Sequence, residues 1–244
     1  SGVRTTGFRA VRGQPEGHFY GGGGVCYPKM VSGIHRIEVE EVSRRFGATL
    51  ALRRVSANFE AGTVTFLEGP NGAGKSTLLA VIGTVLRLTS GSIRYLPLGS
   101  DLQAARGQIG WVAHESHCYL ELTGRENVEL YALLHGIHPG PAWREVRGRV
   151  RAEAFGDRRV GTLSRGQRQR IAIARVLVAK PSVLLLDEPW TGLDSESSAC
   201  LFQVLREEKE RGALIIVASH STEWADGLDA RRLVLEAGRV KASP

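Results

Sequence analysis

The chain has little of what marks a secreted or membrane-embedded protein. Its three cysteines, Cys26, Cys118 and Cys200, lie far apart, which argues against a disulfide framework and against a zinc site. The longest aliphatic runs, 183–186 and 214–218, have the length of strands, whereas a membrane span needs about 20 apolar residues. No basic segment followed by an apolar segment and a cleavage site is present near the N-terminus. We therefore expect reduced thiols and a cytoplasmic location.

Acidic residues are outnumbered by basic ones, which leaves a net charge of +7 and a pI of 9.7. A basic surplus can indicate a nucleic-acid partner or an anionic membrane surface. Much of the surplus consists of arginines between 144 and 175, which are mixed with Glu145, Glu153 and Asp157 and lack interleaved aromatic residues that could stack on bases. We expect a solvated helical face, with an anionic membrane surface as second candidate and no nucleic-acid partner.

The N-terminal part of the chain differs from the rest. Residues 1–33 contain a run of glycines, 21–24, and show no apolar periodicity, which predicts a disordered N-terminal extension. The only methionine is Met30, so a native start at Met30 is one interpretation. Regular apolar patterning begins at Ile34. Because the chain is long enough to bury a sizeable core, we expect a single domain over 34–244.

Strand and helix patterns alternate from Ile34 onward. The expected strands are short apolar or alternating segments, at 37–40, 55–59, 63–67, 109–113, 183–186, 214–218 and 232–235. The expected helices lie at 77–88, in two or three pieces of 123–156 broken at 136–141, at 167–179, at 195–211 and, as a short helix, near Glu223. Strands that alternate with helices predict an α/β fold with a mostly parallel sheet covered on both faces. A helical insert occupies the middle of the chain.

A glycine-rich loop follows the strand expected at 63–67. It reads Gly69, Pro70, Asn71, Gly72, Ala73, Gly74, Lys75, Ser76 and Thr77. Backbone N–H groups of such a loop wrap phosphates at the positive end of the following helix. Lys75 would reach the β- and γ-phosphates, and the Ser76 hydroxyl would bind Mg²⁺. Glycine-rich loops also occur by chance, but a strand before and a helix after make this a specific signal.

Two carboxylates stand at the end of the apolar strand 183–186. Asp187 would lie near Mg²⁺, in contact through water, and Glu188 projects beyond it, where it could orient and polarise an attacking water. Alone, an Asp-Glu pair after a strand could also be a solvated strand end. The other motifs in the chain favour the catalytic interpretation of this pair.

A further motif opens the helix expected at 167–179. It reads Leu163, Ser164, Arg165, Gly166 and Gln167, and its N–H groups with the Ser164 hydroxyl could bind an anion or simply cap the helix. Together with the phosphate-binding loop and Leu-Leu-Asp-Glu-Pro at 185–189, it makes the chain from Ile34 onward resemble an ATP-binding cassette (ABC) ATPase. The resemblance implies a P-loop NTPase core with an N-terminal antiparallel β subdomain and a helical subdomain at about 115–165. It also implies that ATP and Mg²⁺ are used, and that the 163–167 motif binds the ATP of a second copy in a head-to-tail homodimer.

The resemblance also implies roles for Phe46, Asp194 and His220. Phe46 would stack on adenine, although a core or edge phenylalanine is the alternative. Asp194 belongs to the loop that communicates across the dimer. His220 matches the histidine that contacts the γ-phosphate, although a lone histidine at a strand end is more often structural or exposed.

His114 departs from the family pattern, which has glutamine after the strand at 109–113. Histidine suits Mg²⁺ poorly, so we expect His114 to act on the attacking water or to contact the transmembrane partner. The alternative is that His114 has no role and stands at a position that tolerates substitution. The segment from Gly110 to Gly136, which includes His114, is similar to the ATP-binding subunit of the bacterial cytochrome c biogenesis (haem) exporter. Arg165, in place of a glycine, is a tolerated departure.

The resemblance implies a transport ATPase that drives a separate transmembrane permease docked around 114–136. Its expected location is the cytoplasmic face of the inner membrane, as a peripheral protein. The alternatives are another ABC efflux system, for drugs, lipids or polysaccharides, and a soluble nucleic-acid-associated ABC ATPase. The latter usually shows tandem cassettes or coiled-coil insertions, which this chain lacks. A degenerate, purely regulatory module is disfavoured because Lys75, Asp187, Glu188 and His220 are all present.

Overall fold

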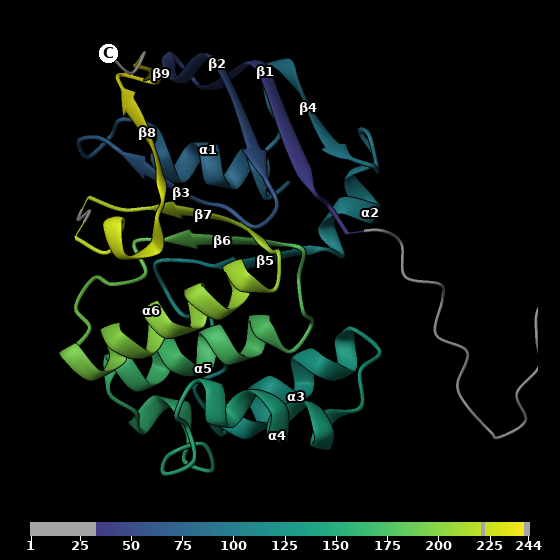
Figure 1. The fold of residues 1–244 in the computed structure, drawn as a ribbon, viewed down its shortest axis with the longest axis vertical. Helices are drawn as coiled ribbons and strands as arrows, with labels where there is room; N and C mark the ends of the chain where they lie inside the picture. Colours follow the sequence, from purple (N-terminus) through teal and green to yellow (C-terminus); the bar gives the residue numbers. More distant parts are fainter. Residues whose placement is uncertain (1–32, 221–222, 242–244) are drawn as a thin grey trace, which may run out of the picture. The chain divides into compact units, whose positions relative to one another are not determined.

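The computed structural model describes residues 33–220 and 223–241, and this part of the chain contains two principal β-sheets (Figure 1). One is antiparallel, with strand order β2-β1-β4. The other has the order β5-β6-β7-β3-β8-β9 and is parallel except for the β8–β9 pair. The strands are β1 (Arg36–Phe46), β2 (Thr49–Glu60), β3 (Val64–Glu68), β4 (Ser90–Leu96), β5 (Ile109–Val112), β6 (Val183–Asp187), β7 (Leu214–Ala218), β8 (Arg231–Glu236) and β9 (Arg239–Val240). The predicted α/β fold with an N-terminal antiparallel part is confirmed.

Helices cover both faces of the parallel sheet. Helix α1 lies between the two sheets, and α5 and α6 lie on the opposite face (Figure 1). Helices α3 and α4 pack beyond α5, within the predicted helical interval 115–165. The helices are α1 (Lys75–Ile82), α2 (Leu102–Arg106), α3 (Gly124–Leu134), α4 (Pro139–Arg149), α5 (Arg165–Leu177) and α6 (Ser195–Glu210), with short 3-10 turns η1 (Val160–Thr162) and η2 (Asp226–Leu228).

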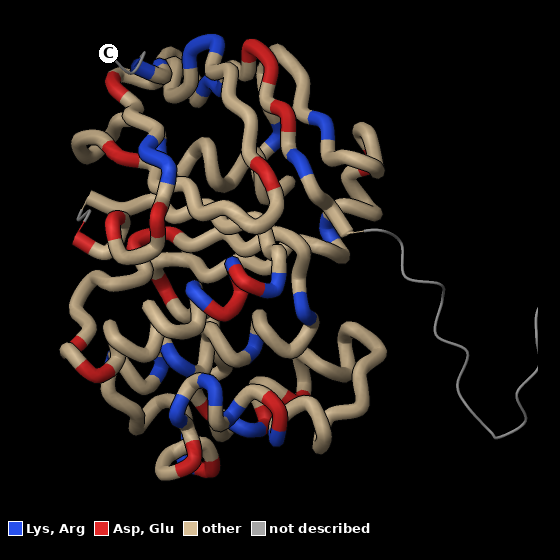
Figure 2. The backbone as a smooth tube through the Cα atoms, in the orientation of Figure 1, with Lys and Arg blue, Asp and Glu red and all other residues tan. Residues whose placement is uncertain are grey.

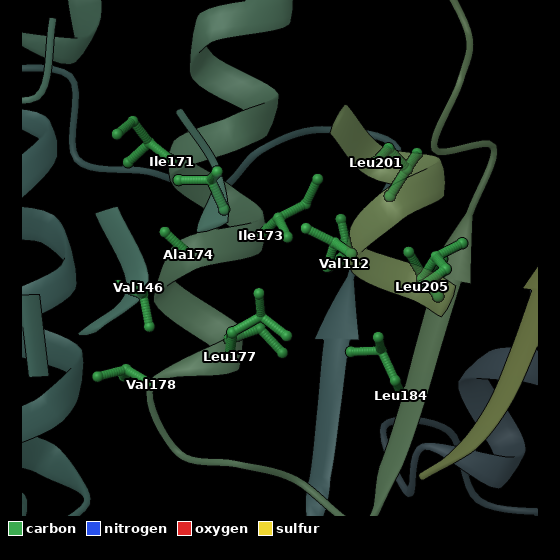
Figure 3. Packing of buried hydrophobic residues seen from close by; sticks show 14 of the residues in the cluster. Val112, Val146, Ile171, Ile173, Ala174, Leu177, Val178, Leu184, Leu201 and Leu205 are labelled. Atoms are coloured by element: carbon green, nitrogen blue, oxygen red, sulfur yellow. The ribbon is translucent and has the colours of Figure 1, made fainter. Parts of the chain in front are cut away.

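Successive side chains of the central strands point into two different cores. Val183 of β6 packs with α1 and the antiparallel sheet, whereas the next residue, Leu184, packs with α5 and α6. Figure 3 shows the second core, where Ile173 of α5, Val112 of β5 and Leu205 of α6 meet. Because these strands are covered on both faces, they are apolar without alternation. This burial holds the carboxyl ends of the strands, where the loops emerge, in place.

Two helix boundaries differ from the predicted ones. The helix expected over 77–88 ends at Ile82. At Gly83 a Cβ would lie 2.3 Å from a carbon of the Trp111 ring, and Thr84 has a left-handed φ of 61°, which interrupts a helix. Helix α4 begins at Pro139, inside the break expected at 136–141, because proline suits the first turn of a helix.

Strands β4 and β9 and helix α2 are not among the elements expected from the sequence. The short helix expected near Glu223 is the 3-10 turn η2. The edge strands β4 and β9 exist because each pairs with another strand, β1 or β8. The predicted disordered extension, with Cys26 and Met30, lies outside the described residues except for Gly33.

Charged residues of both signs are interspersed over the helical layer (Figure 2). The Arg149 guanidinium bridges Glu207 and Glu208, at 2.9 and 2.7 Å. The Arg170 guanidinium contacts Glu196 at 3.0 Å. These two arginines of the basic segment are thus tied into the fold and are not part of the solvated face that the sequence predicts. Within the described residues, no helix is long and apolar enough to cross a bilayer.

Candidate functional site

Residues 69–77 connect β3 to α1 as the predicted phosphate-binding loop. Gly69, Gly72 and Gly74 have φ values of 135°, 78° and 106°, which glycine adopts readily and other residues rarely do. A Cβ at Gly69 would lie 2.0 Å from the Leu235 carbonyl oxygen, so the loop also needs glycine for space. Gly74 supplies no side-chain cap to α1, which leaves the first N–H groups of the helix available to an anion. The loop lines a cavity of about 230 Å³.

Lys75 and Ser76 begin α1 at this cavity. The buried Lys75 ammonium donates to the carbonyl oxygens of Gly69 and Pro70, at 2.8 and 3.3 Å. The Ser76 hydroxyl donates to Asp187 Oδ1 at 2.9 Å, so the strand end and the loop meet here. Hydroxyl and carboxylate oxygens are the ligands that Mg²⁺ prefers, directly or through water. The residues present therefore fit this metal.

Asp187 ends β6 in a partly buried position. Burial raises the pKa of its carboxyl group above the ordinary range, and the neighbouring Glu188 carboxylate adds to the rise, while the hydrogen bond from Ser76 opposes it. Burial thus penalises the charged form of Asp187. A cation bound beside the carboxylate would offset that penalty, which agrees with the predicted metal contact.

Glu188 and His220 contact each other across neighbouring strands. The Glu188 Oε2 atom lies 2.8 Å from His220 Nδ1. Strands β6 and β7 are parallel neighbours in which Asp187 pairs with Ala218, so Glu188 and His220 follow adjacent strand ends. Glu188 itself has a left-handed φ of 48°, and its N–H donates to the Ala218 carbonyl oxygen at 2.8 Å. The backbone therefore aims this carboxylate at the imidazole.

A second cavity, of about 390 Å³, joins these groups to the phosphate-binding loop. It is lined by Gly69, Pro70, Asn71, His114, Glu188, Thr191 and His220. His114, Glu188 and His220 come from three different strand ends, of β5, β6 and β7. The structure thus brings together the carboxylate, both histidines and the loop that the sequence singles out.

The 163–167 motif lies at the N-terminus of α5. Ser164 caps the helix: its Oγ accepts from the Gln167 N–H at 3.2 Å, and Gln167 Oε1 accepts from the Ser164 N–H at 3.1 Å. Gly166 packs against α6, where a Cβ would lie 2.4 Å from the Ser197 hydroxyl oxygen. In the described part of the chain, no residue of this motif lines either cavity at the phosphate-binding loop.

The loop after Glu188 contacts the same end of α5. Asp194 caps α6, because its Oδ1 accepts from the Ser197 N–H at 2.7 Å, and this bond lowers the pKa of the Asp194 carboxyl group. A Cβ at Gly192 would lie 3.1 Å from the guanidinium carbon of Arg165. Arg165 therefore packs over this loop. The communication of Asp194 across a dimer stays a prediction.

Phe46 lies at the tip of the β1–β2 hairpin and is 44% exposed, so it is not a core residue. The guanidinium carbon of Arg44 lies 4.5 Å from the centroid of its ring, a cation–π contact. Among the described residues, Phe46 does not line the two cavities at the loop. Its stacking on adenine stays a prediction.

Comparison with known proteins identifies the family. A family model described as ABC transporter matches residues 52–191, more than half of the chain. The chain belongs to the ABC transporter family. Its ATPase domain uses ATP with Mg²⁺.

Curated relatives of this ABC ATPase include exporters and importers. The Nod factor export ATP-binding protein I of Burkholderia lata is 34% identical over 208 residues, which cover 83% of this chain and 68% of the relative. The daunorubicin resistance ATP-binding protein DrrA2 of Streptomyces coeruleorubidus is 33% identical over 215 residues, 85% of this chain and 66% of the relative. The phosphonates import ATP-binding protein PhnC of Frankia casuarinae is 37% identical over 227 residues, 82% and 89% of the two chains.

Solved structures agree with the fold. The dimeric structure of MJ0796, a bacterial ABC transporter cassette, superposes with a TM-score of 0.78 at 29% identity and covers 84% of this chain and 97% of that chain. A post-hydrolysis state of the same cassette, bound to ADP and Pi, has a TM-score of 0.77 at the same identity and coverage. The fold described above is that of an ABC ATPase cassette.

A third cavity of the ABC ATPase, of about 610 Å³, lies between the strand end of β5 and α5. It is lined by His114, Glu115, Ser116, His117, Cys118, Leu120, Arg165, Arg168 and Gln169. Leu120 of its lining is 49% exposed, and the preceding residue, Tyr119, is 60% exposed. Leu133 and Leu134, at the end of α3, are exposed by 59% and 75%. Burial raises the pKa of the Cys118 thiol, although Arg175 opposes the rise, and a raised pKa disfavours the thiolate form that reacts.

Sequence reasoning missed the groups that brace the phosphate-binding loop from behind. In the β8–β9 turn, the Gly238 N–H donates to the Ala73 carbonyl oxygen at 3.0 Å, and the Gly238 carbonyl oxygen accepts from the Arg53 N–H at 2.7 Å. A Cβ at Gly238 would lie 2.6 Å from the Ala51 carbonyl oxygen, so glycine is required there. No local pattern marks this role, because a glycine in a hairpin turn is explained by the turn alone.

Proposed function

We propose that this ABC ATPase hydrolyses ATP within a homodimer and thereby powers a separate transmembrane subunit. The observation that carries the proposal is the Glu188–His220 contact of 2.8 Å, which faces a cavity shared with the phosphate-binding loop. A carboxylate in that position can orient and polarise a water molecule near a bound γ-phosphate. The imidazole beside it can contact the γ-phosphate.

Each remaining group has a role consistent with its contacts. Lys75, now bonded to loop carbonyl oxygens, would turn to the β- and γ-phosphates and stabilise their charge. Ser76 and Asp187 would hold Mg²⁺, which neutralises phosphate charge when bound. Phe46 would stack on the adenine ring. His114 would contact the attacking water or report on the nucleotide to the partner.

A second copy would complete the site through the motif at 163–167. Ser164 and Arg165 are exposed, and neither lines the chain's own phosphate-binding loop cavity. In a head-to-tail pair they would bind the ATP held by the other copy, a closed twofold arrangement. The similar cassette MJ0796 forms a dimer, which supports this arrangement.

The transmembrane partner would dock at the third cavity and the exposed apolar residues around it. Exposed large side chains that gather in one place commonly mark a protein interface. His114 lines both this cavity and the one that contains Glu188, so it is suited to link docking and hydrolysis. The protein would then sit peripherally on the cytoplasmic face of the inner membrane, close to anionic lipid.

The Glu188→Gln variant tests the proposed chemistry. Glutamine keeps the size of the side chain but cannot polarise water as a carboxylate does, so turnover should fall by about 100-fold or more while ATP binding is retained. The variant should also accumulate as an ATP-bound dimer in size-exclusion chromatography. The exposed Glu121→Gln change serves as control and should leave phosphate release unaltered. Near-normal turnover of Glu188→Gln would contradict the assignment.

The finer proposal is a haem exporter-type complex in cytochrome c maturation. It rests on His114 and on the similarity of the segment from Gly110 to Gly136, and the relatives named above point to other cargoes. Another efflux system is therefore the second candidate, favoured by the relatives named for Nod factor export and daunorubicin resistance. Deletion of the gene should abolish covalent haem staining of c-type cytochromes, and pulldown should recover the membrane partner. Normal cytochromes would refute the haem assignment and leave the ATPase proposal intact.

A further inference from the structure

Four aromatic side chains form a connected stack at the ends of the central strands. The rings of Trp190 and Trp224 are nearly parallel, at 6°, with centroids 5.9 Å apart. Phe66 of β3 stacks on Trp190 at 5.8 Å and 21°. Phe202 of α6 contacts Trp224 at 5.6 Å and 45°. These distances are those of favourable aromatic pairs, and we call the four residues the aromatic stack.

Three residues of the aromatic stack are close in sequence to Glu188, to His220 and to the phosphate-binding loop. Trp190 is two residues after Glu188, and Trp224 is four residues after His220. Phe66 is three residues before the phosphate-binding loop. The Trp190–Trp224 pair therefore connects the loop after β6 with the loop after β7, and Phe66 anchors the pair on the strand between β7 and β8.

The two proposed catalytic groups lie just past the ends of their strands. Strand β6 ends at Asp187 and β7 at Ala218, and the Glu188 N–H still donates to the Ala218 carbonyl oxygen at 2.8 Å. Glu188 has a left-handed backbone, and the side chain of His220 is 61% exposed. Trp190, in contrast, is only 8% exposed, and Trp224 is partly buried against the same core. Stacked rings held by a core can fix the spacing of the chain segments that carry them.

We propose that the stacked pair Trp190–Trp224 is a positioning device that sets the distance between Glu188 and His220. Neither tryptophan lines the two cavities at the phosphate-binding loop, within the described residues, so both act through the catalytic pair and do not touch the nucleotide. This inference rests on the proposed roles of Glu188 and His220.

The test compares Trp224→Leu in two backgrounds, the wild-type chain and His220→Ala. Leucine keeps an apolar side chain but removes the flat ring, and a misplacement of about 1 Å can cost about 100-fold in rate. In the wild-type chain we expect kcat to fall about tenfold or more, with the KM for ATP changed less than about twofold. In the His220→Ala background, measured by single-turnover phosphate release, the same change should cause no further loss. Trp224→Phe should restore most of the rate.

A buried tryptophan elsewhere provides the control. Trp143→Leu alters the same kind of side chain in the helical part, packed against Gly156, and should leave kcat unchanged. An equal loss from Trp224→Leu in both backgrounds, an equal loss from Trp143→Leu, or no loss from Trp224→Leu would each overturn the positioning role. Failure of the proposed catalytic roles is seen separately, as near-normal turnover of Glu188→Gln.

Discussion

Substitution of Gly166 by alanine tests the packing of α5 against α6 most directly. The added Cβ would lie 2.4 Å from the Ser197 hydroxyl oxygen and 3.1 Å from the Ser197 Cβ, whereas ordinary contact begins at 3.4 Å. One of the helices must therefore move by up to an ångström, and overpacking of this kind costs about 1–3 kcal/mol. Alanine is favoured over glycine in a helix by about 0.5–1 kcal/mol, which leaves a net loss centred on about 1 kcal/mol.

Urea and thermal denaturation would measure this loss, expected as a Tm lower by about 2–4 °C for a chain of this size. The Ser197→Gly change removes both contacting atoms, so in that background Gly166→Ala should cost nothing, a double-mutant coupling that isolates the contact. Gly148→Ala is the matched control, because its Cβ would meet only Glu153 at 3.5 Å, and it should be neutral or stabilising. An equal penalty for Gly166→Ala with and without Ser197 would refute the reasoning.

Three further predictions concern charge, base stacking and a buried hydroxyl. Because the pKa of Asp187 is raised on folding, the charged carboxylate destabilises the nucleotide-free protein as the pH rises through that pKa. Asp187→Asn should therefore raise the Tm at neutral pH, and this gain in Tm should disappear below the ordinary carboxyl pKa. A gain in Tm that is the same at all pH values would exclude this cause. Phe46→Leu should raise the KM for ATP several-fold with little change in kcat, measured by phosphate release, and an unchanged KM would exclude stacking on adenine. Tyr95→Phe removes the buried bond of 2.6 Å to the Ile82 carbonyl oxygen at the end of α1 and should cost about 1–3 kcal/mol in urea unfolding, whereas no loss would show that the bond contributes nothing net.

Much of the site could be predicted because its chemistry is local in sequence. The phosphate-binding loop with Lys75 is a contiguous run, and its glycines have the left-handed φ values that the motif requires. Asp187 and Glu188 follow directly from an apolar strand. His220 could be singled out only through the family resemblance, and its contact with Glu188 could not be foreseen from either residue alone. Helix α1 ends earlier than the apolar pattern predicts, because Thr84 has a left-handed backbone that this pattern does not reveal.

The sequence by itself determined the α/β pattern, the family and the residues proposed to bind a nucleotide, because periodicity and short motifs act over a few neighbouring residues. Only the tertiary structure decided which strand ends meet, and with them the Glu188–His220 contact and the packing of Gly166 on α6. The aromatic stack is also decided by the tertiary structure, because its four rings come from β3, α6 and two loops. Such contacts depend on strand order and helix packing, which no local run of residues encodes.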